Sequence, residues 1–216
     1  MLDNKIKQKN VLLIIANIIS IIFCLLCLIL VVIYLINGDK NNRVLPCIGM
    51  AICYILPVLL RCFKIFLPNS LVVIYLLFIT IGGFLGSCLS LYYKIPALDI
   101  IVHSLWGYVV CVLAIYLLCK IKKDALNGTL FLVLFVFSFS MATASMWELI
   151  EFFSDAVLGQ TSQGVPINGV VSVSDTMIDI LCHFCGTVLF LLQYLIEKLT
   201  KRNLGIGWMI SDFNNK

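Results

Sequence analysis

The sequence predicts an all-α integral membrane protein with six transmembrane helices. Hydrophobic residues make up 62% of its 216 positions and charged residues only 12%. The apolar residues are gathered in six long runs, and the Lys and Arg residues lie near the ends of those runs. A soluble domain carries about a quarter charged residues, so this composition excludes a water-exposed globular fold. The net charge of +4 therefore does not indicate a nucleic-acid partner.

Each apolar run is long enough to cross a membrane, which takes about 20 helical residues. In lipid these runs must be helices, because every backbone N–H and C=O needs a partner within its own segment. The first run is longer than a typical signal-peptide core and has no small-residue cleavage site after it, so we expect a retained helix. The predicted helices cover residues 11–37, 45–66, 70–92, 97–119, 128–156 and 174–198.

The distribution of polar residues divides this single membrane domain, 1–216, into functional parts. Residues 1–96 are predicted to form an apolar scaffold of three helices, and residues 97–198 to form three helices that carry a polar site. Residues 199–216 are expected to be a short cytoplasmic tail.

The basic residues predict the orientation of the helices. With both termini in the cytoplasm, the outer side holds only Lys40, Arg43 and Lys94, and the other twelve of the 15 Lys and Arg residues lie on the inner side. This is a strong positive-inside bias. We expect an N-in, C-in protein of the cytoplasmic membrane.

Ionisable residues are concentrated in the last three predicted helices. Six of the 11 acidic residues and both histidines lie in the halves of these helices that share one membrane side, at spacings that put each set on one helical face. Counted from the helix ends at 1.5 Å per residue, all eight lie within about 15 Å of the same membrane border. We expect the three faces to meet, with Gly107 and Gly186 allowing a close helix approach. The residues are Asp99 and His103, then Glu148, Glu151 and Asp155, then Asp175, Asp179 and His183.

This cluster is predicted to bind a divalent metal ion. Six carboxylates in a low-dielectric layer must take up protons, bind cations or open to water, and no Lys or Arg lies among them. Mixed oxygen and nitrogen donors suit Zn²⁺, Mn²⁺ or Fe²⁺ better than Ca²⁺. The predicted metal ligands are His103, Glu148, Glu151 and Asp179, and the predicted acid, base or orienting residues are Asp99, Asp175 and His183.

Simpler explanations compete for several of these residues. Asp99 and Asp175 lie at helix starts, where capping and the helix dipole favour a carboxylate, and Asp155 can be a solvated residue at a helix end. The deeper residues could form a purely structural hydrogen-bond network, although ionisable groups inside membranes are usually functional. Cys182 and Cys185 flank the second histidine, but thiolate ligation is a weak alternative in a chain with 10 scattered cysteines.

The segment 157–173 has no charge and joins the fifth and sixth predicted helices. An Asn168-Gly169 turn between short apolar stretches predicts a small hairpin. Its position next to the cluster suits a lid over the site and a passive connector equally well.

Three motifs resemble a known family. D-I-I-V-H-S-L-W-G at 99–107, W-E-L-I-E at 147–151 and S-D-T-M-I-D-I-L-C-H-F-C-G at 174–186 resemble the YjdF-like family of bacterial inner-membrane proteins, over roughly residues 70–195. The resemblance implies a fold and a motif set on the last three helices, and no reaction. The resemblance also implies that relatives have Asn at the position of His183. The residues it marks are Asp99, His103, Gly107, Glu148, Glu151, Asp175, Asp179 and Gly186.

Three functions are compatible with this pattern. The favoured one is a metal-dependent intramembrane hydrolase or transferase that acts on a lipid or lipid-linked substrate at the outer leaflet. A cation or proton-coupled transporter is the second, but the inner halves of the helices lack matching acids or histidines, and helices one to three hold no repeat of the motif. A non-catalytic membrane subunit is the third. The expected contacts are membrane lipids, and the oligomeric state is open.

The predicted orientation can be tested by labelling intact cells. A cysteine introduced near Asn168 should react with a membrane-impermeant reagent, whereas tags at either terminus should be protected. Labelling of the termini from outside would contradict the orientation and the outer-leaflet site together.

Overall fold

The computed structural model describes residues 2–39, 43–65, 67–121, 126, 128–163 and 173–214 of the chain. Within this part the regular secondary structure is helical and contains no strand, as the sequence predicts. Six helices are long and apolar enough to cross a membrane. The chain forms two compact units, Met1–Leu98 and Asp99–Lys216. The hairpin predicted around Asn168 lies outside the described residues.

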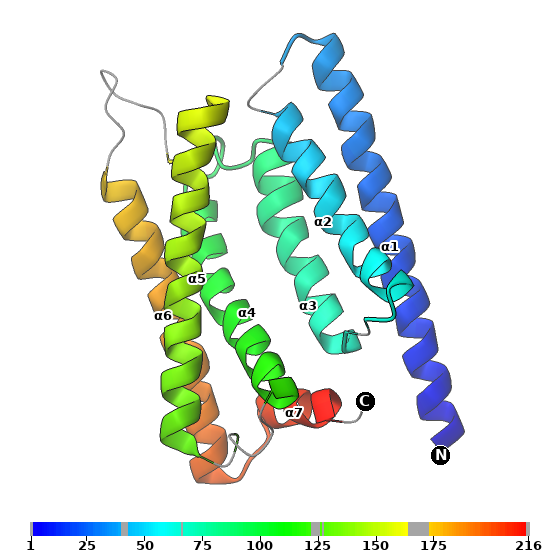
Figure 1. The fold of residues 1–216 in the computed structure, drawn as a ribbon, viewed down its shortest axis with the longest axis vertical. Coiled ribbons are helices and arrows are strands. Elements are labelled where there is room, and N and C mark those ends of the chain that lie inside the picture. Colours follow the sequence, from blue (N-terminus) through cyan, green and yellow to red (C-terminus); the bar gives the residue numbers. More distant parts are fainter. Residues whose placement is uncertain are drawn as a thin grey trace. The chain divides into compact units, whose positions relative to one another are not determined.

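The first unit contains three α-helices and a π-helical segment (Figure 1). Its core is built from small and apolar side chains, and Cys27, Cys47 and Cys88 are fully buried there, as expected for packing residues. Tyrosine hydroxyls join the helices: Tyr34 donates to the carbonyl of Cys88, and Tyr54 Oη lies 2.8 Å from Thr80 Oγ1. The elements are α1 (Leu2–Ile36), α2 (Val44–Cys62), α3 (Asn69–Ile79) and η1 (Thr80–Cys88).

The helices of this unit differ from their predicted extents. The first covers Leu2–Ile36 rather than 11–37, so it begins nine residues earlier, within the polar N-terminal stretch. The second ends at Cys62 rather than at 66, because Lys64 adopts a φ of +61° and the N–H of Ile65 donates to the carbonyl of Leu60, which closes the helix end. The third changes from α to π geometry at Thr80 and ends at Cys88. The apolar pattern of 70–92 predicts a helix but does not encode this change of winding.

The second unit contains α4 (Ala97–Ile121), α5 (Thr129–Leu158), α6 (Val173–Thr200) and the short α7 (Ile206–Asn214) (Figure 1). The α5 helix extends two residues past its predicted end and stops where Gly159 adopts a φ of +64°, a conformation that favours glycine.

Helices α4 and α6 approach each other at two glycines, which confirms the close approach predicted for them. A Cβ added to Gly107 would lie 2.1 Å from the carbonyl oxygen of His183, and a Cβ added to Gly186 would lie 1.9 Å from that of Ser104. The two contacts are reciprocal, because each glycine faces the backbone of the other helix. Only a residue without a side chain fits at either position.

The α7 helix lies in the segment predicted as a plain tail. The carboxylate of Glu197 accepts hydrogen bonds from the N–H groups of Ile206 and Gly207, each at 2.9 Å, and so caps the first turn of α7. Ile206 and Phe213 are buried, and the Phe213 ring lies 5.4 Å from that of Tyr116 on α4. The sequence signal is the apolar spacing of Ile206, Met209 and Phe213, which is typical of an amphipathic helix.

Many large apolar side chains of the long helices are exposed on the surface of the protein. Examples are Ile14 and Leu25 on α1 and Leu149, Ile150 and Phe153 on α5, each about half-exposed. A surface this apolar cannot face water, whereas it matches the hydrocarbon layer of a bilayer.

The crossing of α4 and α6 can be tested by adding a single methyl group. Gly186→Ala should destabilise the protein by about 1–3 kcal/mol, because the methyl group forces the two backbones apart. Gly49→Ala is the matched control, since a Cβ there meets no atom within 4 Å. The measurement is the thermal unfolding midpoint in detergent micelles. Equal midpoints for the two variants would contradict a tight crossing.

Candidate metal centre

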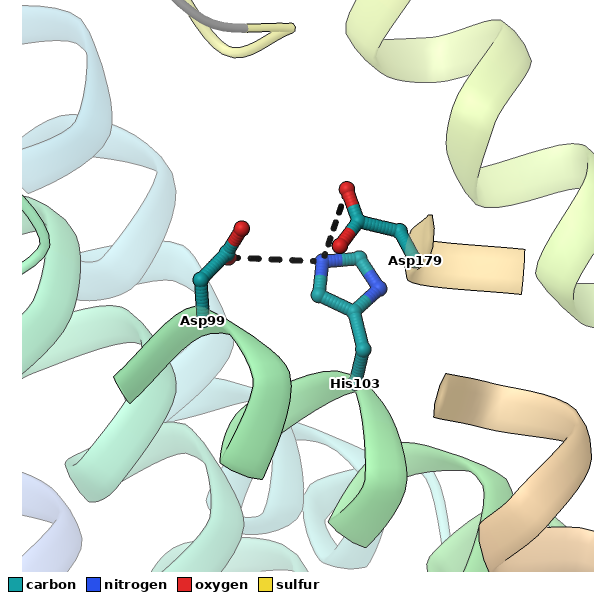
Figure 2. A group of neighbouring side chains, drawn as sticks. All are labelled: Asp99, His103 and Asp179. Atoms are coloured by element: carbon teal, nitrogen blue, oxygen red, sulfur yellow. Dashed lines mark ion pairs between the residues drawn. The ribbon is translucent and has the colours of Figure 1, made fainter. Parts of the chain in front are cut away.

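A histidine and two aspartates from α4 and α6 point toward one another near the start of both helices (Figure 2). His103 Nε2 lies 3.6 Å from Asp99 Oδ1 and 3.8 Å from Asp179 Oδ2. Asp99 and His103 share one face of α4 because they are four residues apart. His103 and Asp179 are buried, and Asp99 is partly exposed at the helix start.

These separations are too long for hydrogen bonds, which join N–H and O at 2.7–3.2 Å. They are close to the spacing of donors that share a metal ion. Two donors that each bind an ion at about 2.1 Å stand about 3.0–3.4 Å apart at octahedral and tetrahedral angles. Closing a gap of a few tenths of an ångström requires only small side-chain rotations, so Asp99, His103 and Asp179 could hold a divalent cation.

Glu148 and Glu151 of α5 form a second group with Asp179. One oxygen from each of the three carboxylates lies within 4.8 Å of the other two. Glu148 is only 7% exposed, and its Oε2 is buried without a hydrogen-bond partner among the described residues. An ionised carboxylate oxygen in that environment carries a large desolvation cost unless a cation is near.

Two tryptophans lie beside this second group. The indole N–H of Trp147 donates to Glu151 Oε1 at 2.8 Å, which fixes that carboxylate and leaves its other oxygen for the cluster. The Trp106 and Trp147 rings lie 6.3 Å apart and join α4 to α5. The structure thus places Trp147 in direct contact with a carboxylate of the second group.

His183 lies one helical turn deeper on α6 than Asp179 and takes part in a separate buried network. Its Nε2 lies 2.8 Å from Ser140 Oγ, and Ser140 Oγ lies 2.8 Å from Thr187 Oγ1. The Thr187 hydroxyl in turn donates to the carbonyl of His183. We infer that Nε2 carries the proton and donates to Ser140, because a buried N–H without an acceptor is rarer than a buried acceptor without a donor. Nδ1, which has no hydrogen-bond partner in the part of the chain described, is then a free acceptor.

The other predicted carboxylates lie at the edge of the site. Asp175 is partly buried in the first turn of α6 and belongs to neither donor group. Asp155 accepts hydrogen bonds from the backbone N–H groups of Ser162 and Gln163, at 2.8 and 2.9 Å. It holds the chain after α5, which agrees with a structural residue at a helix end.

Ser140 and Thr187 were not among the predicted site residues, although their spacing in the sequence places them on the same helical faces. Thr187 continues the α6 series of Asp179 and His183 by four residues, and Ser140 precedes Glu148 by eight residues on one face of α5. Both hydroxyl residues are fully buried. Serine and threonine are common in membrane helices, so their spacing alone did not single them out.

The His183 network can be tested through its central hydroxyl. Ser140→Ala removes the acceptor for the buried Nε2–H of His183 and should lower the free energy of unfolding by about 1–2 kcal/mol. Ser145→Ala, on the same helix, is the control because its exposed hydroxyl bonds only to its own helix backbone at Met141. Thermal unfolding in detergent compares them, and a neutral Ser140→Ala would contradict this proton assignment.

Comparison with known proteins identifies a family and no characterised relative. No curated protein and no solved structure matches the sequence. One sequence family matches residues 18–198, which cover all the residues of both donor groups and most of each membrane-spanning helix. The chain therefore belongs to the family described as predicted membrane protein, DUF2238.

Proposed function

We propose that this protein is a divalent-metal-dependent membrane enzyme, a hydrolase or transferase that acts on a lipid or lipid-linked substrate. The observation that carries the proposal is the convergence of His103 Nε2 with carboxylate oxygens of Asp99 and Asp179 at donor spacing. This mixed set of donors favours Zn²⁺, Mn²⁺ or Fe²⁺. A metal ion in such a site can polarise a carbonyl or phosphoryl oxygen and activate water.

The charges of the site support a cation more than an anion. Neither donor group has an ion pair with Lys or Arg among the described residues, so a substrate phosphate would have no guanidinium to bind it. The carboxylates can instead hold the metal, and the metal can hold an anionic substrate.

The geometry suggests a role for each predicted site residue. His103, Asp179, Glu148 and Glu151 serve as ligands, and Asp99 joins them because its Oδ1 faces His103 Nε2. Asp175 is partly exposed and lies outside both donor groups, so it is free to act as general base or acid. His183 is buried and its Nε2 contacts Ser140, so we assign it a positioning role rather than a direct one.

The depth of the site suggests the substrate class. Asp99 lies in the first turn of α4, and Glu148 lies ten residues before the end of α5. At 1.5 Å per residue the site extends to about 15 Å below the helix ends. That level is reached by the head group and upper chains of a lipid more readily than by a soluble substrate.

The distribution of basic residues supports a proposal for the orientation and the location of the protein. We infer an N-in, C-in arrangement in the cytoplasmic membrane, which puts the site in the outer leaflet. The motifs at 99–107, 147–151 and 174–186 support a narrower assignment to the YjdF-like bacterial inner-membrane proteins.

The proposal can be tested with purified protein in vesicles of bacterial total lipid extract. Mass spectrometry should find bound Zn, Mn or Fe, and lipid analysis should find a product that forms with loaded protein but not with chelator-stripped protein. Asp179→Asn removes an anionic ligand and should lower both metal affinity and product formation more than about tenfold.

Asp155→Asn is the control, because Asp155 bonds to the following loop rather than to either donor group. Protein that binds no metal would overturn the proposal. Metal-dependent ion flux across the vesicle membrane without any change in the lipids would favour the transporter instead.

A further inference from the structure

Asp179 belongs to both donor groups of the second unit. It lies with Asp99 and His103 in one group and with Glu148 and Glu151 in the other. We propose that the site holds two divalent cations side by side, bridged by the carboxylate of Asp179. This inference rests on the proposed function and adds the number of ions and the arrangement of their ligands.

The five residues do not form a single group of donors in the structure. Donors on opposite sides of one ion are about 4.2 Å apart, twice a bond of about 2.1 Å. The donor atoms of the five residues do not all lie within 4.8 Å of one another, although each group of three does. Two positions therefore account for the arrangement, and a shared carboxylate oxygen pair suits ions about 3.5–4 Å apart.

The second position has support that does not depend on the first. Glu148 is 93% buried, with an Oε2 that has no hydrogen-bond partner among described residues. Glu151 Oε1 is held by the Trp147 indole at 2.8 Å, so the carboxylate is already oriented and its second oxygen is available. An oriented, partly exposed carboxylate beside a buried, unpartnered one is an arrangement that a cation stabilises.

Charge balance also favours two ions over one. The two groups contain four carboxylates and one imidazole, Asp99, Asp179, Glu148, Glu151 and His103. One divalent cation would leave two negative charges uncompensated in a low-dielectric layer, whereas two divalent cations neutralise all four. The neutral imidazole adds a donor without altering this balance.

Manganese titration of the chelator-stripped, full-length protein in detergent tests the proposal. Elemental analysis should find two Mn²⁺ per chain, and electron paramagnetic resonance should show the exchange-coupled signal of a bridged pair. Glu151→Gln keeps the acceptor for Trp147 but removes a charged ligand, so it should lower the count to one and leave an uncoupled signal. His103→Gln should do the same from the other position.

The control Asp155→Asn should keep two coupled ions. One Mn²⁺ in the wild type with no effect of Glu151→Gln would overturn the two-ion arrangement and leave the metal-dependent function standing. Two ions without exchange coupling would overturn the bridge by Asp179. Absence of binding would overturn both proposals, and the elution profile of each variant shows whether it is folded.

Discussion

The close approach of α4 and α6 is the constraint on which the site depends. Gly107 faces the backbone of His183 and Gly186 faces the backbone of Ser104, so the two helices contact through main-chain atoms at this level. This crossing fixes the register of the helices as well as their separation. His103 lies one turn from Gly107 and Asp179 lies two turns from Gly186, and so their side chains meet across the interface. A larger residue at either glycine would separate the donors.

The same packing creates an electrostatic cost. Glu148 and Asp179 are buried within a few ångströms of each other, without an ion pair to Lys or Arg in the part of the chain described. A purely structural role would be better served by serine or threonine, which can bond their own helix backbone at little cost, as Ser145 does. Buried carboxylates carry a large desolvation free energy when they only hold helices together, whereas they bind cations well. The cost therefore supports a ligand role for them.

Helical periodicity explains how much could be predicted from the sequence. The six spans follow from apolar length, and the shared faces of Asp99 with His103 and of Glu148 with Glu151 follow from their spacing. Periodicity gives the face of a residue but not its partner across an interface. The pairing of Asp179 with Asp99 and His103 therefore depends on the glycine crossing of α4 and α6, and its pairing with Glu148 and Glu151 depends on the packing of α5 against α6. The π-helical turn from Thr80 to Cys88 was missed for a related reason, since apolar residues are compatible with either winding.

The α7 helix could not be predicted from the sequence for a different reason. Its stability depends on a tertiary contact, the capping of its first turn by Glu197 of α6. A nine-residue helix is marginal by itself in water, so local propensity does not predict it. The apolar face of Ile206, Met209 and Phe213 is buried only in the folded protein, where the Tyr116 ring of α4 contacts Phe213.

The side chains that lie beyond the His183 network in the second unit bear on whether the polar cluster is a one-sided site or part of an ion path. Beyond Ser140 and Thr187 an apolar layer follows the polar faces that begin at Asp99, Glu148 and Asp179, and on α6 the buried Tyr194 and Glu197 lie beyond that layer. Along the same faces, the next buried side chains are apolar, and those of the second unit that are at most 1% exposed include Val110, Cys111, Ala114, Val136, Leu132 and Phe190. An ion passing through that layer would lose its hydration without gaining a ligand, which costs several kcal/mol or more. Within the second unit, Ser140 and His183 therefore form the inner limit of the polar cluster, which agrees with the proposed one-sided site.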